Sequence, residues 1–434
     1  MKKLLLSLVL VGSVAQAQFW TPKATGFATA SRGLDCFAIV DQNVIWAKAY
    51  DGSGAANQTI KDITKSIDGG NTWTPGVVSA FSISTLAMSS ITAVSANTAW
   101  VSMYPTGAAT GGIWKTTNGG TSWTKQTTAL FTGGTSFTNL VYFWDENNGV
   151  CQGDPEGGYF EIYTTSNGGT TWTRVPSANI PAPLTGEYGY VHNYDVVGNT
   201  FWFGTNLGRI FRSTDMGLTW QVFQSPVSDF GGTGESGQYT FSDQNKGLLN
   251  SSFGLLWSTT DGGATWTPVV PTGTFGNNSL EYVPGTTNVI STGGATGYGS
   301  YYSLDDGLTW QVAEATTQFT VLAFRDNTTG FAGGFNTNAT TGGVFKYTGT
   351  QLRTIDLTRE QVSVYPNPTN GIVNITGADV KQVTVFDISG KKVYQNEFMP
   401  GDANVDLSVL EIGTYLLQAT DDNGSVKTIK VIKQ

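Results

Sequence analysis

The sequence predicts an all-β fold, in which a four-stranded unit is repeated around a closed ring and a small β-sandwich follows. Three observations lead to this prediction. An eight-residue cassette, Ser/Thr-x-Asp/Asn-x-Gly-x-Ser/Thr-Trp, recurs six times, with its Trp residues 44 to 50 residues apart. The 55 Gly residues and the low charged fraction of 13% favour short strands and tight turns over long helices. The last part of the chain holds several short alternating runs separated by turn dipeptides.

The first 17 residues are predicted to be a signal peptide. Lys2 and Lys3 form a basic start, Leu4 to Val14 form an apolar core too short to span a bilayer, and Ala15-Gln16-Ala17 is a small-x-small cleavage site. We therefore expect an exported protein that begins near Gln18. No later stretch approaches the roughly 20 apolar residues of a transmembrane helix, so we expect no membrane span.

The cassettes are predicted to be turns between the third and fourth strands of each unit. Their Asp or Asn can accept hydrogen bonds from nearby N–H groups, Gly tolerates the positive φ of a tight turn, and Trp can fill the gap between neighbouring sheets. We therefore expect a structural role for the following residues: Asp68, Trp73, Asn118, Trp123, Asn167, Trp172, Asp215, Trp220, Asp261, Trp266, Asp305 and Trp310.

The repeat spacing fits the size of a propeller blade, four short strands in about 45 residues. Beyond the sixth cassette the chain still has three strand-like runs without a fourth, at Phe319–Phe324, Thr329–Gly333 and Gly343–Tyr347. The missing strand is predicted at the other end, where Phe19-Trp20-Thr21-Pro22 resembles the cassette strand Thr72-Trp73-Thr74-Pro75. The sequence thus predicts a seven-bladed β-propeller over residues 18–349, closed by its N-terminal strand.

Residues 350–361 carry no cassette and are predicted to be a linker. Residues 362–434 contain about seven short alternating runs punctuated by Asn-Pro, Asn-Gly and Ser-Gly, which predicts a small Ig-like β-sandwich. The expected strands are Val362–Tyr365, Ile372–Ile375, Gln382–Asp387, Lys392–Tyr394, Asn404–Leu407, Thr414–Thr420 and Val426–Ile432.

These motifs resemble known families. The cassettes are similar to the Asp-box, or bacterial neuraminidase repeat, which sialidases, xyloglucanases, sortilin-type receptors and photosystem II assembly factors share. The tandem spacing most resembles the assembly-factor-like group. This resemblance implies the propeller fold and leaves the activity open.

The tail carries Val364-Tyr365-Pro366-Asn367-Pro368-Thr369-x-Gly371, Val385-Phe386-Asp387-x-x-Gly390-Lys391 and Leu410-x-x-Gly413-x-Tyr415. These motifs resemble the type A sorting domain of the type IX secretion system. The resemblance implies a Bacteroidota-type bacterium, the type IX secretion machinery as a partner of residues 362–434, and release or attachment at the cell surface. The tails of this family are typically removed, and a cut in 350–361 would fit. A plain Ig-like module is the alternative.

Composition excludes several function classes. A net charge of −9 argues against nucleic acid or anionic lipid as a partner, because phosphates need clustered Lys and Arg. With His192 as the single His, we expect no metal, no cofactor and no Ser-His-Asp triad. Cys36 and Cys151 are predicted on strands two blades apart, as buried free thiols. We expect a monomer.

Five candidate site residues lie on loops predicted opposite the cassette turns: Asp154, Glu156, Glu187, Asp229 and Glu235. The sixth, His192, lies on a strand predicted to line the central channel. Carboxylates beside aromatic residues such as Tyr188 suit sugar binding, and two of them could act as acid and base in glycoside hydrolysis. The alternative interpretation for each is structural: Asp154 and Glu156 flank a turn-forming Pro, and a lone His is often a hydrogen-bonded filler.

The function predicted from these features is a secreted or cell-surface propeller that binds a glycan or an envelope protein. No residue is assigned a catalytic role. The alternatives are a glycoside hydrolase that uses a pair of the loop carboxylates, and an assembly-type chaperone. A sialidase is disfavoured, because the Arg-Ile-Pro motif of that family is absent from this sequence.

Overall fold

The computed structural model describes residues 18–55, 59–78, 85–107, 110–293, 297–349, 352, 363–376, 380–398, 403–421 and 426–434. The predicted signal peptide and nearly all of the predicted linker lie outside these residues. The chain divides into two compact units, Met1–Leu352 and Arg353–Gln434.

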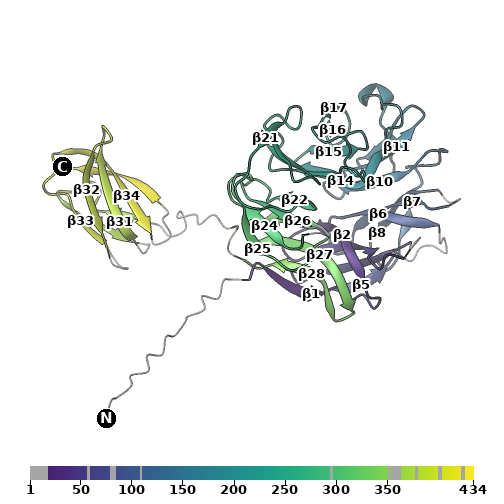
Figure 1. Cartoon of the computed structure of the whole chain (residues 1–434), viewed down its shortest axis with the longest axis horizontal. Coiled ribbons are helices and arrows are strands. Elements are labelled where there is room, and N and C mark those ends of the chain that lie inside the picture. Colours follow the sequence, from purple (N-terminus) through teal and green to yellow (C-terminus); the bar gives the residue numbers. More distant parts are fainter. Residues whose placement is uncertain are drawn as a thin grey trace, which may run out of the picture. The chain divides into compact units, whose positions relative to one another are not determined.

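In the first unit, the described strands form seven antiparallel groups of four, which we number as blades 1 to 7 (Figure 1). The first strands are β2 (Arg32–Ile39), β6 (Leu86–Ala93), β10 (Thr138–Phe143), β14 (Gly189–Val197), β18 (Gly237–Phe241), β22 (Ser279–Tyr282) and β26 (Leu322–Asp326). The second strands are β3 (Ile45–Asp51), β7 (Ala99–Pro105), β11 (Gly149–Glu156), β15 (Thr200–Thr205), β19 (Gly247–Ser251), β23 (Val289–Thr292) and β27 (Thr329–Asn338).

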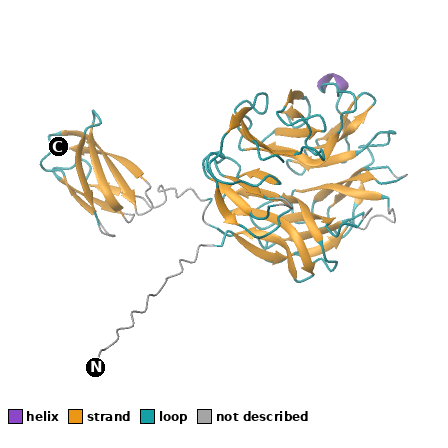
Figure 2. Cartoon of the chain, viewed as in Figure 1, coloured by secondary structure: helices purple, strands orange, loops and turns teal. Residues whose placement is uncertain are grey.

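The third strands are β4 (Asp62–Ser66), β8 (Gly112–Thr116), β12 (Tyr159–Thr165), β16 (Arg209–Ser213), β20 (Leu256–Thr259), β24 (Ser300–Ser303) and β28 (Thr341–Tyr347). The fourth strands are β5 (Thr74–Val77), β9 (Thr124–Lys125), β13 (Thr173–Arg174), β17 (Gln221–Gln224), β21 (Thr267–Val269), β25 (Gln311–Glu314) and β1 (Trp20–Ala24). Strands and loops make up nearly all of the described chain, and a short 3-10 helix, Ser177–Asn179, lies between β13 and β14 (Figure 2).

The first strands contact one another in cyclic succession, from β2 through β6, β10, β14, β18, β22 and β26 back to β2. They therefore surround a common axis, which makes this unit a β-propeller. The predicted all-β propeller is confirmed, and the described strands fit the predicted count of seven blades.

The ring is closed by the N-terminal strand. β1 pairs antiparallel with β28, with Trp20 opposite Tyr347 and Ala24 opposite Gly343. The strands β1 and β28 come from opposite ends of the propeller sequence, so their pairing joins the two ends of the ring. It also covers the edge of β28 that would otherwise be unpaired.

Each cassette forms a hydrogen-bonded turn. In the first, Asp68 Oδ1 accepts from the N–H groups of Asn71 (3.0 Å) and Thr72 (2.9 Å), and the Ser66 hydroxyl accepts from Gly70 N at 2.8 Å. Burial alone would raise the pKa of Asp68, but the hydrogen bonds that it accepts, led by that of the Thr72 hydroxyl, lower it to about 2. The side chain therefore remains ionised and holds the turn.

The gaps between blades are filled by aromatic residues and bridged by cations. Trp100 of blade 2 stacks on Phe143 of blade 3, with ring centroids 3.6 Å apart. Lys65 of blade 1 lies 4.5 Å from the Trp46 ring and donates to two carbonyls of blade 2, at 2.9 and 3.0 Å. The arrangement recurs at two further boundaries, with Lys115 over Trp100 and Arg212 over Trp202.

The second unit is a sandwich of two antiparallel sheets. One contains β29 (Ser363–Tyr365), β30 (Ile372–Thr376) and β33 (Ala403–Asp406), and the other contains β32 (Lys392–Glu397), β31 (Val380–Asp387), β34 (Gly413–Asp421) and β35 (Val426–Lys433). Val373 and Ile375 of the first sheet share a core with Val385, Leu417 and Val431 of the second. The seven strands agree with the predicted runs to within a few residues.

The Asn-Pro motif of this unit attaches its first loop to its last strand. The Asn367 side chain donates to Lys430 O at 2.7 Å and accepts from Ile432 N at 2.9 Å. Thr369 N donates to Ile432 O at 2.8 Å. The motif therefore has a structural role within the sandwich.

Candidate functional site

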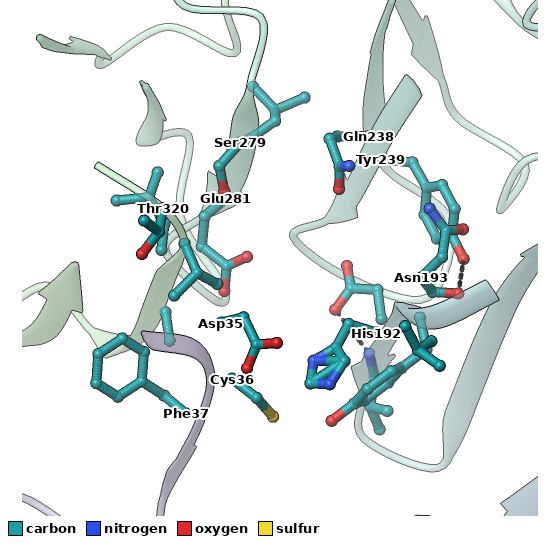
Figure 3. A pocket seen from close by; sticks show the side chains of 18 of the residues that line it. Asp35, Cys36, Phe37, His192, Asn193, Gln238, Tyr239, Ser279, Glu281 and Thr320 are labelled. Carbon is teal, nitrogen blue, oxygen red and sulfur yellow. Dashed lines mark hydrogen bonds between the residues drawn. The ribbon is translucent and has the colours of Figure 1, made fainter. Parts of the chain in front are cut away.

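A cavity of about 500 Å³ lies within the ring of first strands (Figure 3). Its walls come from β2, β10, β14, β18, β22 and β26. The loop between β17 and β18 also contributes, through Phe230 and Gly231. In an antiparallel blade this fourth-to-first loop lies on the face opposite the third-to-fourth turn, so the cavity reaches the face opposite the cassettes.

The first strand of blade 4 is distorted where it meets the cavity. Gly189 of β14 pairs with Thr205, but Tyr194 pairs with Phe203, so the segment between them bulges out of the ladder. Within this bulge His192 has a φ of 61°, a left-handed conformation that a non-Gly residue rarely adopts. The bulge presents Tyr190, Val191 and His192 to the cavity.

Three carboxyl groups line the cavity in different surroundings. Asp35 of β2 forms an ion pair with Lys48 of β3, at 2.6 Å from Nζ to Oδ2. Asp195 of β14 accepts hydrogen bonds from the N–H groups of Val196 and Phe241, each at 2.6 Å. Burial raises the pKa of Asp195 to about 6 in spite of these bonds.

Glu281 of β22 is the third carboxyl group. Among the described residues it accepts one hydrogen bond, a long one of 3.5 Å from Phe324 N. Burial and the nearby charge of Asp195 raise the pKa of Glu281 well above its ordinary value. Figure 3 shows Glu281 and Asp35 on one side of the cavity and His192 on the other.

His192 is the predicted site residue that lines the cavity. Its Nε2 atom is buried and has no hydrogen-bond partner in the described structure. Burial lowers the pKa of His192 to about 4, so the imidazole is neutral at neutral pH.

Asp154 and Asp229 support the bulge from two sides. Asp154 Oδ1 accepts from Gly189 N at 3.0 Å, and burial raises the pKa of this carboxyl group to about 6. Asp229 Oδ1 accepts from the Tyr190 hydroxyl at 2.7 Å. Both predicted residues therefore contact the segment that forms the cavity wall, without lining the cavity themselves.

Glu187 is buried, with 4% of its surface exposed, and forms an ion pair with Arg209. It also accepts from Thr205 Oγ1 at 2.7 Å and from Leu184 N at 2.8 Å. Burial alone would raise the pKa of Glu187, but these bonds, led by that of Arg209, lower it. The carboxylate oxygens of Glu187 therefore bond to protein groups that fix the loop before β14.

Glu156 and Glu235 also bond within their own surroundings. Glu156 accepts from Thr135 N at 3.1 Å and from the Thr135 hydroxyl. Glu235 accepts from Ser228 N at 2.9 Å and from the Ser228 hydroxyl at 2.6 Å. The structure does not bring the six predicted residues together in one cluster, and their role in ligand binding stays a prediction.

Sequence reasoning missed most of the cavity wall. The polar residues that it did not select include Asp35, Asn193, Asp195, Gln238, Asn278, Ser279, Glu281, Thr320 and Arg325. One signal was present: Asp35 and Glu281 are carboxyl residues within short apolar runs, Leu34-Asp35-Cys36-Phe37 and Leu280-Glu281-Tyr282. A charged residue in a buried strand is unusual enough to mark a site.

A metal site does not emerge from the described residues, among which no three His, Cys, Asp or Glu side chains form a group that could hold an ion. Cys36 and Cys151 are buried and unbridged. Burial raises the pKa of Cys36 to about 12, so it is not a thiolate at neutral pH.

Comparison with known proteins identifies the second unit. Residues 363–434 match the family model described as the secretion system C-terminal sorting domain. The chain therefore carries a sorting domain. Such domains mark proteins that the type IX secretion system exports, so the protein is exported to the cell surface or the extracellular space.

The propeller is similar to solved structures of YCF48. The structure titled "YCF48 bound to D1 peptide" is 16% identical with a TM-score of 0.53, and the match covers 76% of this chain and 96% of that one. YCF48 from Cyanidioschyzon merolae is 16% identical with a TM-score of 0.52, over 76% and 99% of the two chains. At this identity the likeness shows the fold alone. No curated protein sequence is significantly similar to this chain.

Within the described part of the chain, no helix has the length and apolar character needed to cross a membrane.

Proposed function

We propose that this exported propeller is a binding module for a glycan, which enters the central cavity from the face opposite the cassettes. The observation that carries the proposal is the cavity itself. Its volume of about 500 Å³ suits one or two sugar rings, and strands from six blades surround it. Amide, hydroxyl and carboxyl groups line it together with aromatic rings.

The polar and aromatic groups of the cavity wall are complementary to the hydroxyl groups and ring faces of a sugar. Hydroxyl groups need donors and acceptors, which Gln238, Asn278, Ser279 and Thr320 can supply. The less polar faces of sugar rings pack on aromatic side chains such as Phe37. An envelope protein is the other ligand class to test, because YCF48 has been solved with a bound peptide and the propeller fold can therefore hold one.

The proposal is tested by binding of the full chain to a glycan array and to soluble polysaccharides. Ser279→Phe should fill part of the cavity and reduce glycan binding at least about tenfold. Leu218→Phe is the control, because Leu218 is exposed on the cassette turn at the opposite face. Both variants should retain the tryptophan fluorescence of the folded propeller. Equal glycan binding by Ser279→Phe and the unchanged protein would refute the cavity as the site.

Glycoside hydrolysis is the second candidate, and one observation favours it. Asp195 and Glu281 share the cavity, and the charge of one raises the pKa of the other. Glycosidases use a protonated and an ionised carboxyl group at the scissile bond. Hydrolysis predicts release of reducing ends from a bound polysaccharide, abolished in Glu281→Gln while binding persists. Polysaccharide binding without release of reducing ends would refute hydrolysis and would agree with the glycan-binding proposal.

A further inference from the structure

Glu281 stands apart from the other carboxyl groups of the cavity because it lacks a strong partner. The Asp35 carboxylate is neutralised by Lys48, and Asp195 accepts two short backbone hydrogen bonds. In the described part of the chain, Glu281 has one hydrogen bond, in which it accepts from Phe324 N at 3.5 Å. Glu281 is partly buried in the cavity wall, where an ionised carboxylate with so few protein partners is more costly than a protonated one.

Among the described residues, the cations at the cavity are paired with carboxylates other than Glu281. Lys48 is paired with Asp35, and Arg325 at the cavity edge is paired with Asp326 at 3.3 Å. His192 faces the cavity from the opposite side but remains neutral, since burial lowers its pKa to about 4. None of these groups offsets a negative charge on Glu281.

The remaining titratable groups of the wall are neutral as well. Burial raises the pKa of the Cys36 thiol and of the Tyr142, Tyr190, Tyr194 and Tyr239 phenols, so that none ionises near neutral pH. The walls that face Glu281 thus combine one neutralised carboxylate, one hydrogen-bonded carboxyl group and a set of uncharged donors and acceptors.

We propose that the cavity selects an uncharged, hydroxyl-rich ligand, a neutral sugar, and that Glu281 is the specificity-determining residue, which donates its proton in a hydrogen bond to a ligand hydroxyl group. The inference rests on the proposed function and names its ligand class. Burial and the Asp195 charge, which raise the pKa of Glu281, agree with the geometry. Anionic sugars are disfavoured by the Asp195 carboxylate. Both oxygens of that carboxylate already accept backbone hydrogen bonds and Asp35 is paired with Lys48, so the described wall offers a cationic sugar no unpartnered carboxylate.

The ionisation state of Glu281 can be measured without any ligand. In the full chain labelled with carboxyl-¹³C glutamate, the Glu281 resonance is identified by its absence from Glu281→Gln. We expect it to remain protonated at pH 7, because the buried surroundings of Glu281 and the Asp195 charge raise its pKa. Titration of Glu281 near the ordinary value would overturn the inference, even if a glycan binds.

Ligand selectivity is measured on a panel of neutral, uronic-acid and amino-sugar oligosaccharides. Glu281→Gln keeps a hydrogen-bond donor without a charge, so its affinity for the neutral sugar should stay within about threefold, while Glu281→Ala should lose at least about tenfold. Glu146→Ala is the matched control on the opposite face. Preference for a charged sugar, or equal losses in Glu281→Gln and Glu281→Ala, would overturn the inference.

The two proposals fail in different ways. If Glu281 is protonated at pH 7 and no member of the panel binds, the glycan-binding function and its ligand class are both refuted, although the neutral wall remains. If a charged sugar binds and Ser279→Phe abolishes that binding, the binding module stands and the role assigned to Glu281 is refuted.

Discussion

Replacing Trp20 with Ala should remove much of the stability of the propeller, because this residue fastens the strand that closes the ring. Trp20 is 2% exposed and packs among the rings of Phe319, Phe324 and Tyr347, with centroids 5.7 to 6.1 Å away. Its indole N–H donates to Ser300 Oγ in blade 6 at 2.8 Å. The side chain thus joins β1 to two blades.

The expected magnitude follows from these contacts. Truncation of a buried Trp to Ala costs about 3–5 kcal/mol, and leaving the buried Ser300 hydroxyl without its donor adds about 1 kcal/mol. We expect Trp20→Ala to lower the free energy of unfolding by about 4–6 kcal/mol. Trp20→Phe keeps a ring and loses the hydrogen bond, so it should cost about 1–2 kcal/mol.

The assay is denaturant unfolding of the full chain followed by tryptophan fluorescence. All 13 Trp residues lie between positions 20 and 310, so this signal reports on the propeller and not on the sorting domain. Thr21→Ala is the control in the same strand, since its hydroxyl shares an exposed hydrogen bond with Thr348 and its loss should cost below about 1 kcal/mol. A loss below about 1 kcal/mol for Trp20→Ala would refute the view that β1 closes the ring.

Three further predictions concern the blade boundaries and the cavity. Lys65→Met, which removes the cation over Trp46 and its two bonds to the next blade, should destabilise the propeller by about 1–3 kcal/mol in the same unfolding assay. His192 has its pKa lowered to about 4, so the stability it contributes is present above its unfolded pKa of about 6.5 and is lost as the pH falls toward 4. Unfolding curves for His192→Gln should therefore lack up to about 3 kcal/mol of this acid-induced loss, and identical pH profiles for the two proteins would contradict the assignment. Asp195→Asn removes the charge that raises the pKa of Glu281, so carboxyl-¹³C titration should show that pKa falling, and no change would mean that the two groups do not interact.

Much of the fold could be predicted because each blade carries its own local signal. The cassette encodes a turn whose hydrogen bonds lie within eight residues, as between Ser66, Asp68 and Thr72. Its spacing therefore marks every blade but the last. Prediction of the seventh blade required a comparison of the N-terminal segment with the distant cassette strands. The pairing of Trp20 with Tyr347 agrees with the predicted closure by the N-terminal strand.

The cavity could not be predicted in the same way, because its wall is assembled from residues that no local pattern connects. Asp35, Asp195 and Glu281 come from blades 1, 4 and 6, and they meet only because the ring closes. Sequence reasoning instead selected loop carboxylates, which have visible turn-forming neighbours. Among these, Asp154 and Asp229 bond to the segment that carries His192 rather than to the cavity.

The bulge in β14 explains why acidic loops lie on the face to which the cavity opens. The bulge in β14 holds His192 at a φ of 61°, a conformation that needs support from its surroundings. Asp154 accepts from the backbone at the start of β14, Asp229 from the Tyr190 hydroxyl, and Glu187 is locked by Arg209 just before the strand. Asp154, Asp229 and Glu187 thus support the segment that forms the wall. Substituting Asp229 with Asn should alter ligand affinity through Tyr190 while leaving the pKa of Glu281 unchanged, which separates support of the wall from contact with the ligand.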